Sequence, residues 1–180
     1  MLLKAKDVTI RAGAKTLIEI QDLEIYDGDR IGLVGKNGAG KTTLLKTLAG
    51  LLPLESGAIE RFGKIEYLPQ LKEQEADKSG GEITQQFIQR AFSKQAGILF
   101  ADEPTTHLDI QHIEWVENSL QHWKGAYVVV SHDRAFLDRV CHKIWEIDEQ
   151  KLRVFKGNYE QYSEQKKKQQ REHEQAYKKY

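Results

Sequence analysis

A glycine-rich loop between an apolar run and a segment with helical periodicity constrains this chain most. The run, residues 30–34, is almost wholly apolar and predicts a strand buried on both faces. Residues 42–51 carry leucines at helical spacing and end before Pro53. The loop itself consists of Gly35, Lys36, Asn37, Gly38, Ala39, Gly40, Lys41 and Thr42.

The residue types of this loop indicate that it binds phosphate. Glycines let consecutive backbone N–H groups close around phosphate oxygens, and the N-terminus of the next helix adds partial positive charge. We expect Lys41 to reach the outer phosphates, the Thr42 hydroxyl to bind Mg²⁺, and Thr43 to complete the nucleotide-binding set. An ordinary glycine-rich turn is the alternative, and the predicted strand and helix on either side argue against it.

A second predicted strand, residues 98–101, ends in the carboxylates Asp102 and Glu103. Open parallel sheets bind ligands at the carboxyl ends of their strands. Asp102 is therefore expected in the Mg²⁺ shell, and Glu103 is expected to hold the attacking water. A strand that ends in two acids is also common at a solvated edge, so this interpretation depends on the glycine-rich loop.

Strands and helices alternate along most of the chain, which predicts an α/β fold with a parallel core sheet flanked by helices. Two alternating runs at the N-terminus, residues 2–10 and 17–26, predict a small antiparallel sheet. A helix is expected to start near residues 79–82, and a charged helix over residues 164–180. Further predicted strands are 65–68, 127–130 and 144–147, and further helices are 110–120 and 134–140.

Composition excludes several classes of protein. The 180 residues hold 27 basic and 27 acidic side chains, so overall charge does not draw the chain to nucleic acid. No apolar run approaches the length of a membrane span, and we expect a cytoplasmic protein without membrane contact. The single cysteine, Cys141, is expected in the core, which leaves disulfide and zinc chemistry aside.

Six elements in order resemble those of an ATP-binding cassette (ABC) protein. They are Gly35 to Thr42, Gln70, Ser79-Gly80-Gly81-Glu82, Asp102-Glu103-Pro104, His107-Leu108-Asp109 and Ser131-His132-Asp133. The segments 103–109, 131–138 and 157–162 further resemble subfamily F, the soluble twin-cassette ATPases that act on ribosomes. Within it, the chain is similar to the first cassette of the ribosome-protection proteins that give resistance to streptogramin A, lincosamide and pleuromutilin antibiotics.

The resemblance implies an ABC-type P-loop NTPase fold and Mg²⁺-dependent ATP hydrolysis, weak in a single cassette. Gln70 would touch Mg²⁺ and the lytic water, and His132 would contact the γ-phosphate. The signature residues 79–82 would bind the γ-phosphate held by a facing cassette, with Asp109 in the loop at that interface. Taken alone, residues 79–82 are a capping box at a helix start.

The resemblance also implies how the chain is divided and what it binds. Residues 1–156 would form the cassette, and residues 157–180 would begin a charged helical linker through which the protein reaches ribosomal RNA. The second cassette would come from the same polypeptide, or from a second copy of this fragment. Two rivals remain: an ABC transporter's ATP-binding subunit, and a nucleotide-gated clamp with negligible catalysis.

Three features depart from the usual cassette. Ala12, with Arg11 beside it, occupies the position where an aromatic side chain usually stacks on adenine. Either the Arg11 guanidinium stacks on the base instead, or selectivity for adenine is poor; our hypothesis is that GTP competes well with ATP. Lys78 replaces the leucine that commonly precedes the signature serine. The short segment 71–78 replaces a helical subdomain, which in transporters carries the surface that docks the membrane-spanning subunit.

Overall fold

All nine strands form one mixed sheet in the order β4-β1-β2-β9-β8-β3-β7-β6-β5. The computed structural model describes residues 1–71 and 73–178, with the side chains of residues 73–79, 177 and 178 left aside. The strands are β1 (Leu3–Ala12), β2 (Lys15–Ile25), β3 (Arg30–Gly35), β4 (Ala58–Arg61), β5 (Ile65–Leu68), β6 (Ile98–Asp102), β7 (Ala126–Val130), β8 (Lys143–Asp148) and β9 (Lys151–Lys156).

The central strands β8, β3, β7, β6 and β5 run parallel, as the sequence predicts. Period-two alternation sends successive side chains of β6 to opposite faces, so Ile98 and Phe100 join one hydrophobic cluster while Leu99 and Ala101 join the other. Because both faces of these strands are covered, an uninterrupted apolar run is the expected sequence.

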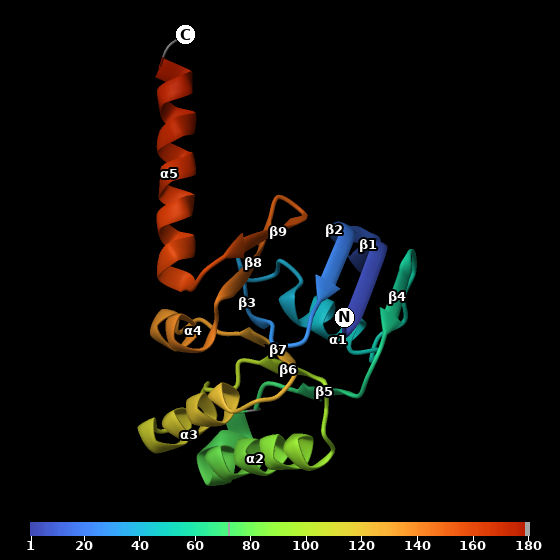
Figure 1. Cartoon of the computed structure of the whole chain (residues 1–180), viewed down its shortest axis with the longest axis vertical. Coiled ribbons are helices and arrows are strands. Elements are labelled where there is room, and N and C mark those ends of the chain that lie inside the picture. Colours follow the sequence, from blue (N-terminus) through green and yellow to red (C-terminus); the bar gives the residue numbers. More distant parts are fainter. Residues whose placement is uncertain (72, 179–180) are drawn as a thin grey trace.

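Helices cover both faces of the parallel strands (Figure 1). On one face, α1 (Lys41–Leu48) packs together with β1 and β2 in the first cluster. On the other face lie α2 (Glu73–Ser93), α3 (Ile110–Gln121) and α4 (Arg134–Val140). Helix α5 (Tyr159–Lys178) packs against the remainder of the chain through its first turns and projects away from it beyond them (Figure 1).

The structure corrects the sequence analysis at several element boundaries. Strands β4 and β9 were not predicted, and β9 connects the antiparallel strands to the central sheet through one parallel pair, Glu19 with Lys151. The tail helix begins at Tyr159, five residues before the expected start. No helix in the described part of the chain is long and apolar enough to cross a membrane.

The expected helix start at Ser79 is wrong, since α2 begins at Glu73. Residues 73–78 are mostly Glu, Gln, Ala and Lys, which are strong helix formers. A helix that runs through Gly80 and Gly81 costs about 1 kcal/mol per glycine, and a long flanking helix can offset that cost. The capping-box interpretation of residues 79–82 therefore fails with it.

Candidate nucleotide-binding site

The glycine-rich loop joins the end of β3 to the start of α1, as predicted. Gly40 precedes the helix in the left-handed region, with φ of +100°, and a Cβ there would lie 3.1 Å from Leu17 Cδ1. Only glycine fits this position without strain or displacement of Leu17. Because Gly40 has no side chain to cap α1, the amides of the first turn remain available to an anion.

Thr42 and Asp102 meet across the top of the sheet. The Thr42 hydroxyl donates a hydrogen bond to Asp102 Oδ2 at 2.6 Å, and Asp102 is 3% exposed. A hydroxyl that donates to a carboxylate keeps its own lone pairs for a cation. The pair therefore has the oxygen donors that Mg²⁺ prefers, and these residues fit the ion predicted from the sequence.

Glu103 is a buried carboxylate with one oxygen held and the other unpartnered. Oε2 accepts a 3.1 Å hydrogen bond from the Thr106 hydroxyl. Oε1 lies 3.1 Å from His132 Nε2, but among the described residues it is the one buried side-chain nitrogen or oxygen that makes no hydrogen bond. A buried acceptor in this state suits a group that must receive a proton or hold a water.

The backbone at Glu103 is also unusual. Its φ is +51°, in the left-handed region that non-glycine residues seldom adopt, and its N–H donates to the Val130 carbonyl at 2.8 Å. Such conformations cost about 1–3 kcal/mol and cluster at functional sites. The bond to β7 holds Glu103 in this conformation at the end of β6.

A cavity of about 430 Å³ brings most of the predicted residues together. From the glycine-rich loop and the first turn of α1 it is lined by Asn37, Gly38, Gly40, Lys41, Thr42 and Thr43, and from other elements by Gln70, Asp102, Glu103 and His132. Ala12 and Leu17 line it too, at the position expected for the base. Gly35, Lys36 and Ala39 are not among its lining residues.

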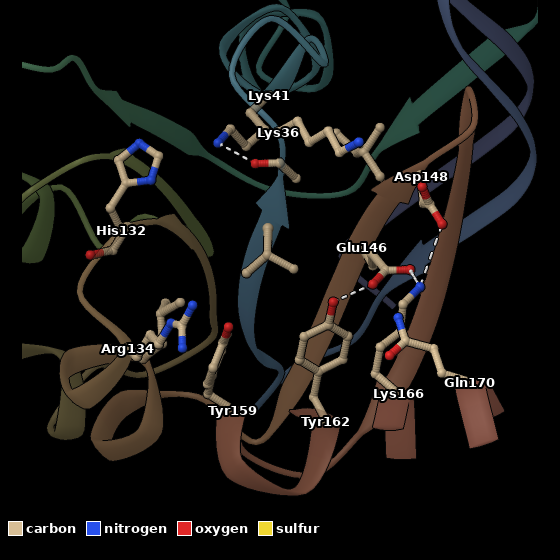
Figure 2. A pocket seen from close by; sticks show the side chains of 15 residues that line it. Lys36, Lys41, His132, Arg134, Glu146, Asp148, Tyr159, Tyr162, Lys166 and Gln170 are labelled. Atoms are coloured by element: carbon tan, nitrogen blue, oxygen red, sulfur yellow. Dashed lines mark hydrogen bonds and ion pairs between the residues drawn. The ribbon is translucent and has the colours of Figure 1, made fainter. Parts of the chain in front are cut away.

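Gly35 and Lys36 line a neighbouring cavity of about 560 Å³ between the loop and the foot of α5. Figure 2 shows His132 and Arg134 on one side of it and Glu146, Asp148 and Lys166 on the other. Lys41 lines both cavities, and its amine donates to the Gly35 carbonyl at 2.8 Å. The predicted phosphate lysine is thus bound to its own loop here.

The foot of α5 is attached by a buried carboxylate that sequence analysis did not single out. Glu146 accepts hydrogen bonds from the Tyr162 hydroxyl and, at 2.9 Å, from Lys166 Nζ. Lys166 also reaches Asp148 at 3.4 Å, and its bond to Glu146 raises the pKa of the lysine above its ordinary value. Both acids of β8 are therefore contacted by the same lysine of α5.

Of the signature residues, Gly80, Gly81 and Glu82 do not line the 430 Å³ cavity. Gly80 is buried inside α2, and a Cβ at Gly81 would lie 2.3 Å from the ring of His112 on α3. The side chains of Lys78 and Ser79 lie outside the described residues, and Glu82 is exposed. Asp109 caps α3 by accepting the His112 N–H at 2.9 Å, and it also lies 2.7 Å from His112 Nδ1.

Sequence analysis also missed Tyr67, whose hydroxyl donates to Asp102 Oδ2 at 3.3 Å. Burial, with the nearby Asp102 charge, raises the pKa of Tyr67 above its usual range, so the hydroxyl stays protonated. Its position on β5, the strand that leads to Gln70, is the sequence signal that could have found it.

Comparison with known proteins relates part of this site to a family. The family model described as "ABC transporter" matches residues 18–74. The erythromycin resistance ATP-binding protein MsrA of Staphylococcus epidermidis is 37% identical over 171 residues, which cover 82% of this chain and 35% of the relative. The ribosome protection protein VmlR of Bacillus subtilis is 33% identical over 196 residues, which cover 93% of this chain and 36% of the relative. The chain thus spans about a third of the length of these relatives.

Solved structures agree on the architecture. An ATP-binding subunit of an ABC transporter matches with a TM-score of 0.73 at 18% identity, covering 87% of this chain and 90% of that one. RNase-L inhibitor matches with a TM-score of 0.73 at 24% identity, covering 87% and 40%. At such identities the likeness shows the fold alone, which is that of an ABC ATPase. The segment that matches the family model contains the glycine-rich loop, and the fold of the chain is that of an ABC ATPase.

Proposed function

We propose that this chain is the first cassette of an ABC-F ribosome-protection protein and that it hydrolyses ATP with Mg²⁺. The observation that carries the ATPase part is the 2.6 Å hydrogen bond between Thr42 and Asp102, with the buried Glu103 carboxylate next in the chain. That arrangement supplies a cation position and a proton acceptor at the same end of the sheet.

The loop amides and Lys41 bind the triphosphate, and the lysine amine exchanges the Gly35 carbonyl for a phosphate oxygen. Thr42, Asp102 and Gln70 are the residues that would hold Mg²⁺, which when bound neutralises charge on the phosphates. The Leu17 and Ala12 surface receives the base.

Glu103 holds the attacking water and accepts its proton. Thr106 fixes one carboxylate oxygen, so the second, Oε1, faces the reaction with a defined direction. His132 lies 3.1 Å from that oxygen and lines the same cavity, which supports a contact between His132 and the γ-phosphate. General-base groups of this kind contribute about 10²- to 10⁴-fold to rate.

The signature residues of this chain serve the nucleotide of a facing cassette. Gly80, Gly81 and Glu82 do not line the cavity, which supports a site completed in trans. An isolated cassette then binds nucleotide through its own loop but turns over slowly, because the second cassette's signature is missing. The loop at Asp109 lies at the interface of the pair.

The names of two relatives support the ribosome as the partner, since one is a ribosome protection protein and the other an erythromycin resistance protein. Residues 157–180 begin the linker, and α5 carries two exposed lysines, Lys167 and Lys168, suited to phosphate contact. ATP-driven closure of the cassettes favours binding to the ribosome, and ATP hydrolysis releases the protein from the ribosome. Both steps take place in the cytoplasm.

The test is sedimentation of the full-length protein with ribosomes. We expect Glu103→Gln to co-sediment with ribosomes only when ATP is present, because nucleotide binds and is not hydrolysed. Lys41→Ala is the matched control, which should lose ATP-dependent sedimentation through loss of nucleotide binding. A Glu103→Gln protein that binds ATP and never sediments with ribosomes would overturn the ribosome proposal and leave the nucleotide site intact.

The alternative is a transporter's ATP-binding subunit, which the similarity to such a subunit favours. One helix, α2, lies between β5 and β6 in the described residues, where the transporter docking subdomain would be inserted. This supports the ribosomal partner over the transporter. Recovery of the full-length protein with a membrane-spanning subunit, rather than with ribosomes, would reverse that choice.

A further inference from the structure

The hydroxyl of Tyr67 reaches the carboxylate at the centre of the candidate site. Tyr67 lies on β5, which pairs in parallel with β6, and its hydroxyl donates to Asp102 Oδ2 at 3.3 Å. The ring is half-buried and packs against the first hydrophobic cluster. Packing therefore fixes the ring of Tyr67, and its hydroxyl is free to contact Asp102.

Two hydroxyls converge on the same oxygen of Asp102. Thr42 Oγ1 lies 2.6 Å and Tyr67 Oη 3.3 Å from Oδ2, and Asp102 is almost fully buried. Two donors on one oxygen of a buried carboxylate fix the plane of the group. The direction of Oδ1 is then fixed as well.

Tyr67 also connects two parts of the site that lie on different strands. Gln70 follows β5 directly and lines the same cavity as Asp102. The hydrogen bond from the Tyr67 hydroxyl to Asp102 ties β5 to the end of β6. Removal of this hydroxyl therefore changes how firmly the Asp102 carboxylate and the loop that carries Gln70 are held in position.

We infer that Tyr67 is a positioning residue for the Mg²⁺ half of the nucleotide site. It orients Asp102 for the ion and holds the Gln70 loop beside it. This inference rests on the proposed Mg²⁺-ATPase function, and it adds a residue that acts through Asp102. The phosphate half of the site, formed by the loop amides and Lys41, does not depend on it.

The variant Tyr67→Phe distinguishes the contribution of the Mg²⁺ half from that of the phosphate half. It keeps the ring in its packing place and removes only the donor. Mutation of a residue that orients a metal ligand typically lowers metal affinity about 10- to 100-fold. Because the bond from Tyr67 is long, at 3.3 Å, we expect a loss of about 10-fold. Nucleotide binding without metal should be unchanged, because no phosphate or base contact involves Tyr67.

The experiment measures binding of a fluorescent ATP analogue to the 180-residue chain, first in EDTA and then along a Mg²⁺ titration. Tyr127→Phe is the matched control. The Tyr127 hydroxyl is also buried and donates to the Val140 carbonyl, and Tyr127 does not line the nucleotide cavity. We expect Tyr67→Phe to shift the Mg²⁺ midpoint about 10-fold upward with unchanged EDTA affinity, and Tyr127→Phe to leave both unchanged.

Three outcomes would overturn the inference. One is a Tyr67→Phe midpoint equal to that of the wild type. Another is a loss of EDTA affinity as large as the loss in Mg²⁺, since that marks general loosening of the fold. The third is an equal midpoint shift in Tyr127→Phe. Failure of the wild-type chain to bind the analogue in either condition is different, because it rejects the proposed nucleotide function itself.

Discussion

At the scale of single residues, Glu103 combines burial, a strained backbone and an unpartnered oxygen. Glu103→Gln keeps the shape of the side chain and removes the proton acceptor. We expect ATP affinity to stay within about 3-fold and steady phosphate release by the full-length protein to fall about 100-fold or more. Glu117→Gln, which alters a carboxylate paired with Arg139 outside the cavity, is the control. Equal phosphate release by Glu103→Gln and the wild type would refute the role of Glu103.

The variant Gly40→Ala tests how closely the glycine-rich loop packs against its surroundings. Alanine there must adopt φ of +100° and place Cβ 3.1 Å from Leu17. Gly28 has a similar φ of +86° but no atom within 4 Å of a Cβ. Both alanine variants should lose about 1–2 kcal/mol of unfolding free energy in urea, but only Gly40→Ala should weaken nucleotide binding. A comparable binding loss in both variants would contradict the close fit of the loop.

Ala12 tests base recognition. It is exposed and lines the nucleotide cavity beside Leu17, so no aromatic ring covers the base there. Stacking of a base on an aromatic side chain contributes about 1–3 kcal/mol, so Ala12→Tyr should tighten ATP binding about 5-fold or more. In the wild type, GTP should compete with ATP to a similar extent in the same competition titration. A strong ATP preference in the wild type would show that another group reads the base.

At the scale of elements, the foot of α5 depends on Glu146. Its side chain is 6% exposed and is bonded to Lys166 and Tyr162. Lys166→Met leaves the carboxylate with one donor fewer, and we expect a loss of about 1–3 kcal/mol in the free energy of unfolding, measured in urea. Lys167→Met, one residue along on the exposed side, is the control and should change stability little. Equal losses in the two variants would mean that the buried ion pair contributes nothing specific.

The elements differed in how far the sequence predicted them. Strands β6 and β7 were predicted almost to the residue, since burial on both faces demands an uninterrupted apolar run. Strand β4, Ala58–Arg61, was missed because it is a short, largely exposed edge strand with little apolar signal. Strand β9 alternates Leu152, Val154 and Phe155 with charged residues irregularly, which hid its period.

The candidate site was predicted in part for a similar reason. Lys41, Thr42, Asp102 and Glu103 follow from short motifs, because local spacing sets what a loop or a strand end presents, whereas Gln70 follows from the family resemblance. Tyr67 and Glu146 could not be found in that way. Their partners, Asp102 and Lys166, are distant in the sequence or on another element, so only the packed fold brings them together.

At the scale of the whole molecule, strand order explains why residues far apart in sequence meet. Strands β3, β7 and β6 are neighbours, and their carboxyl ends carry the glycine-rich loop, residues 131–132 and residues 102–103 respectively. Parallel strands place these ends at one edge of the sheet, where open α/β folds bind ligands. The foot of α5 lies beside β8, and the second cavity lies between it and the glycine-rich loop at this edge (Figure 2).

The buried hydroxyls predict how the whole fold responds to alkali. Burial raises the pKa of Tyr67, Tyr127 and Tyr162 above the ordinary value of 10.0. Above pH 10 the unfolded chain therefore releases protons that the folded chain keeps, so the free energy of unfolding falls as pH rises. The stabilisation by these groups is fully present below the unfolded pKa and is lost as pH rises through the folded pKa.

Each such group contributes a slope of up to about 1.4 kcal/mol per pH unit between its unfolded and folded pKa. Urea unfolding between pH 8 and about pH 11 should show this decline, with a much smaller slope below pH 9 from these tyrosines. Tyr127→Phe removes one titrating hydroxyl, so its alkaline slope should be shallower by up to that amount, whatever its stability at pH 8. A slope in Tyr127→Phe equal to that of the wild type would mean that this hydroxyl ionises alike in both states, against its burial and its bond to Val140.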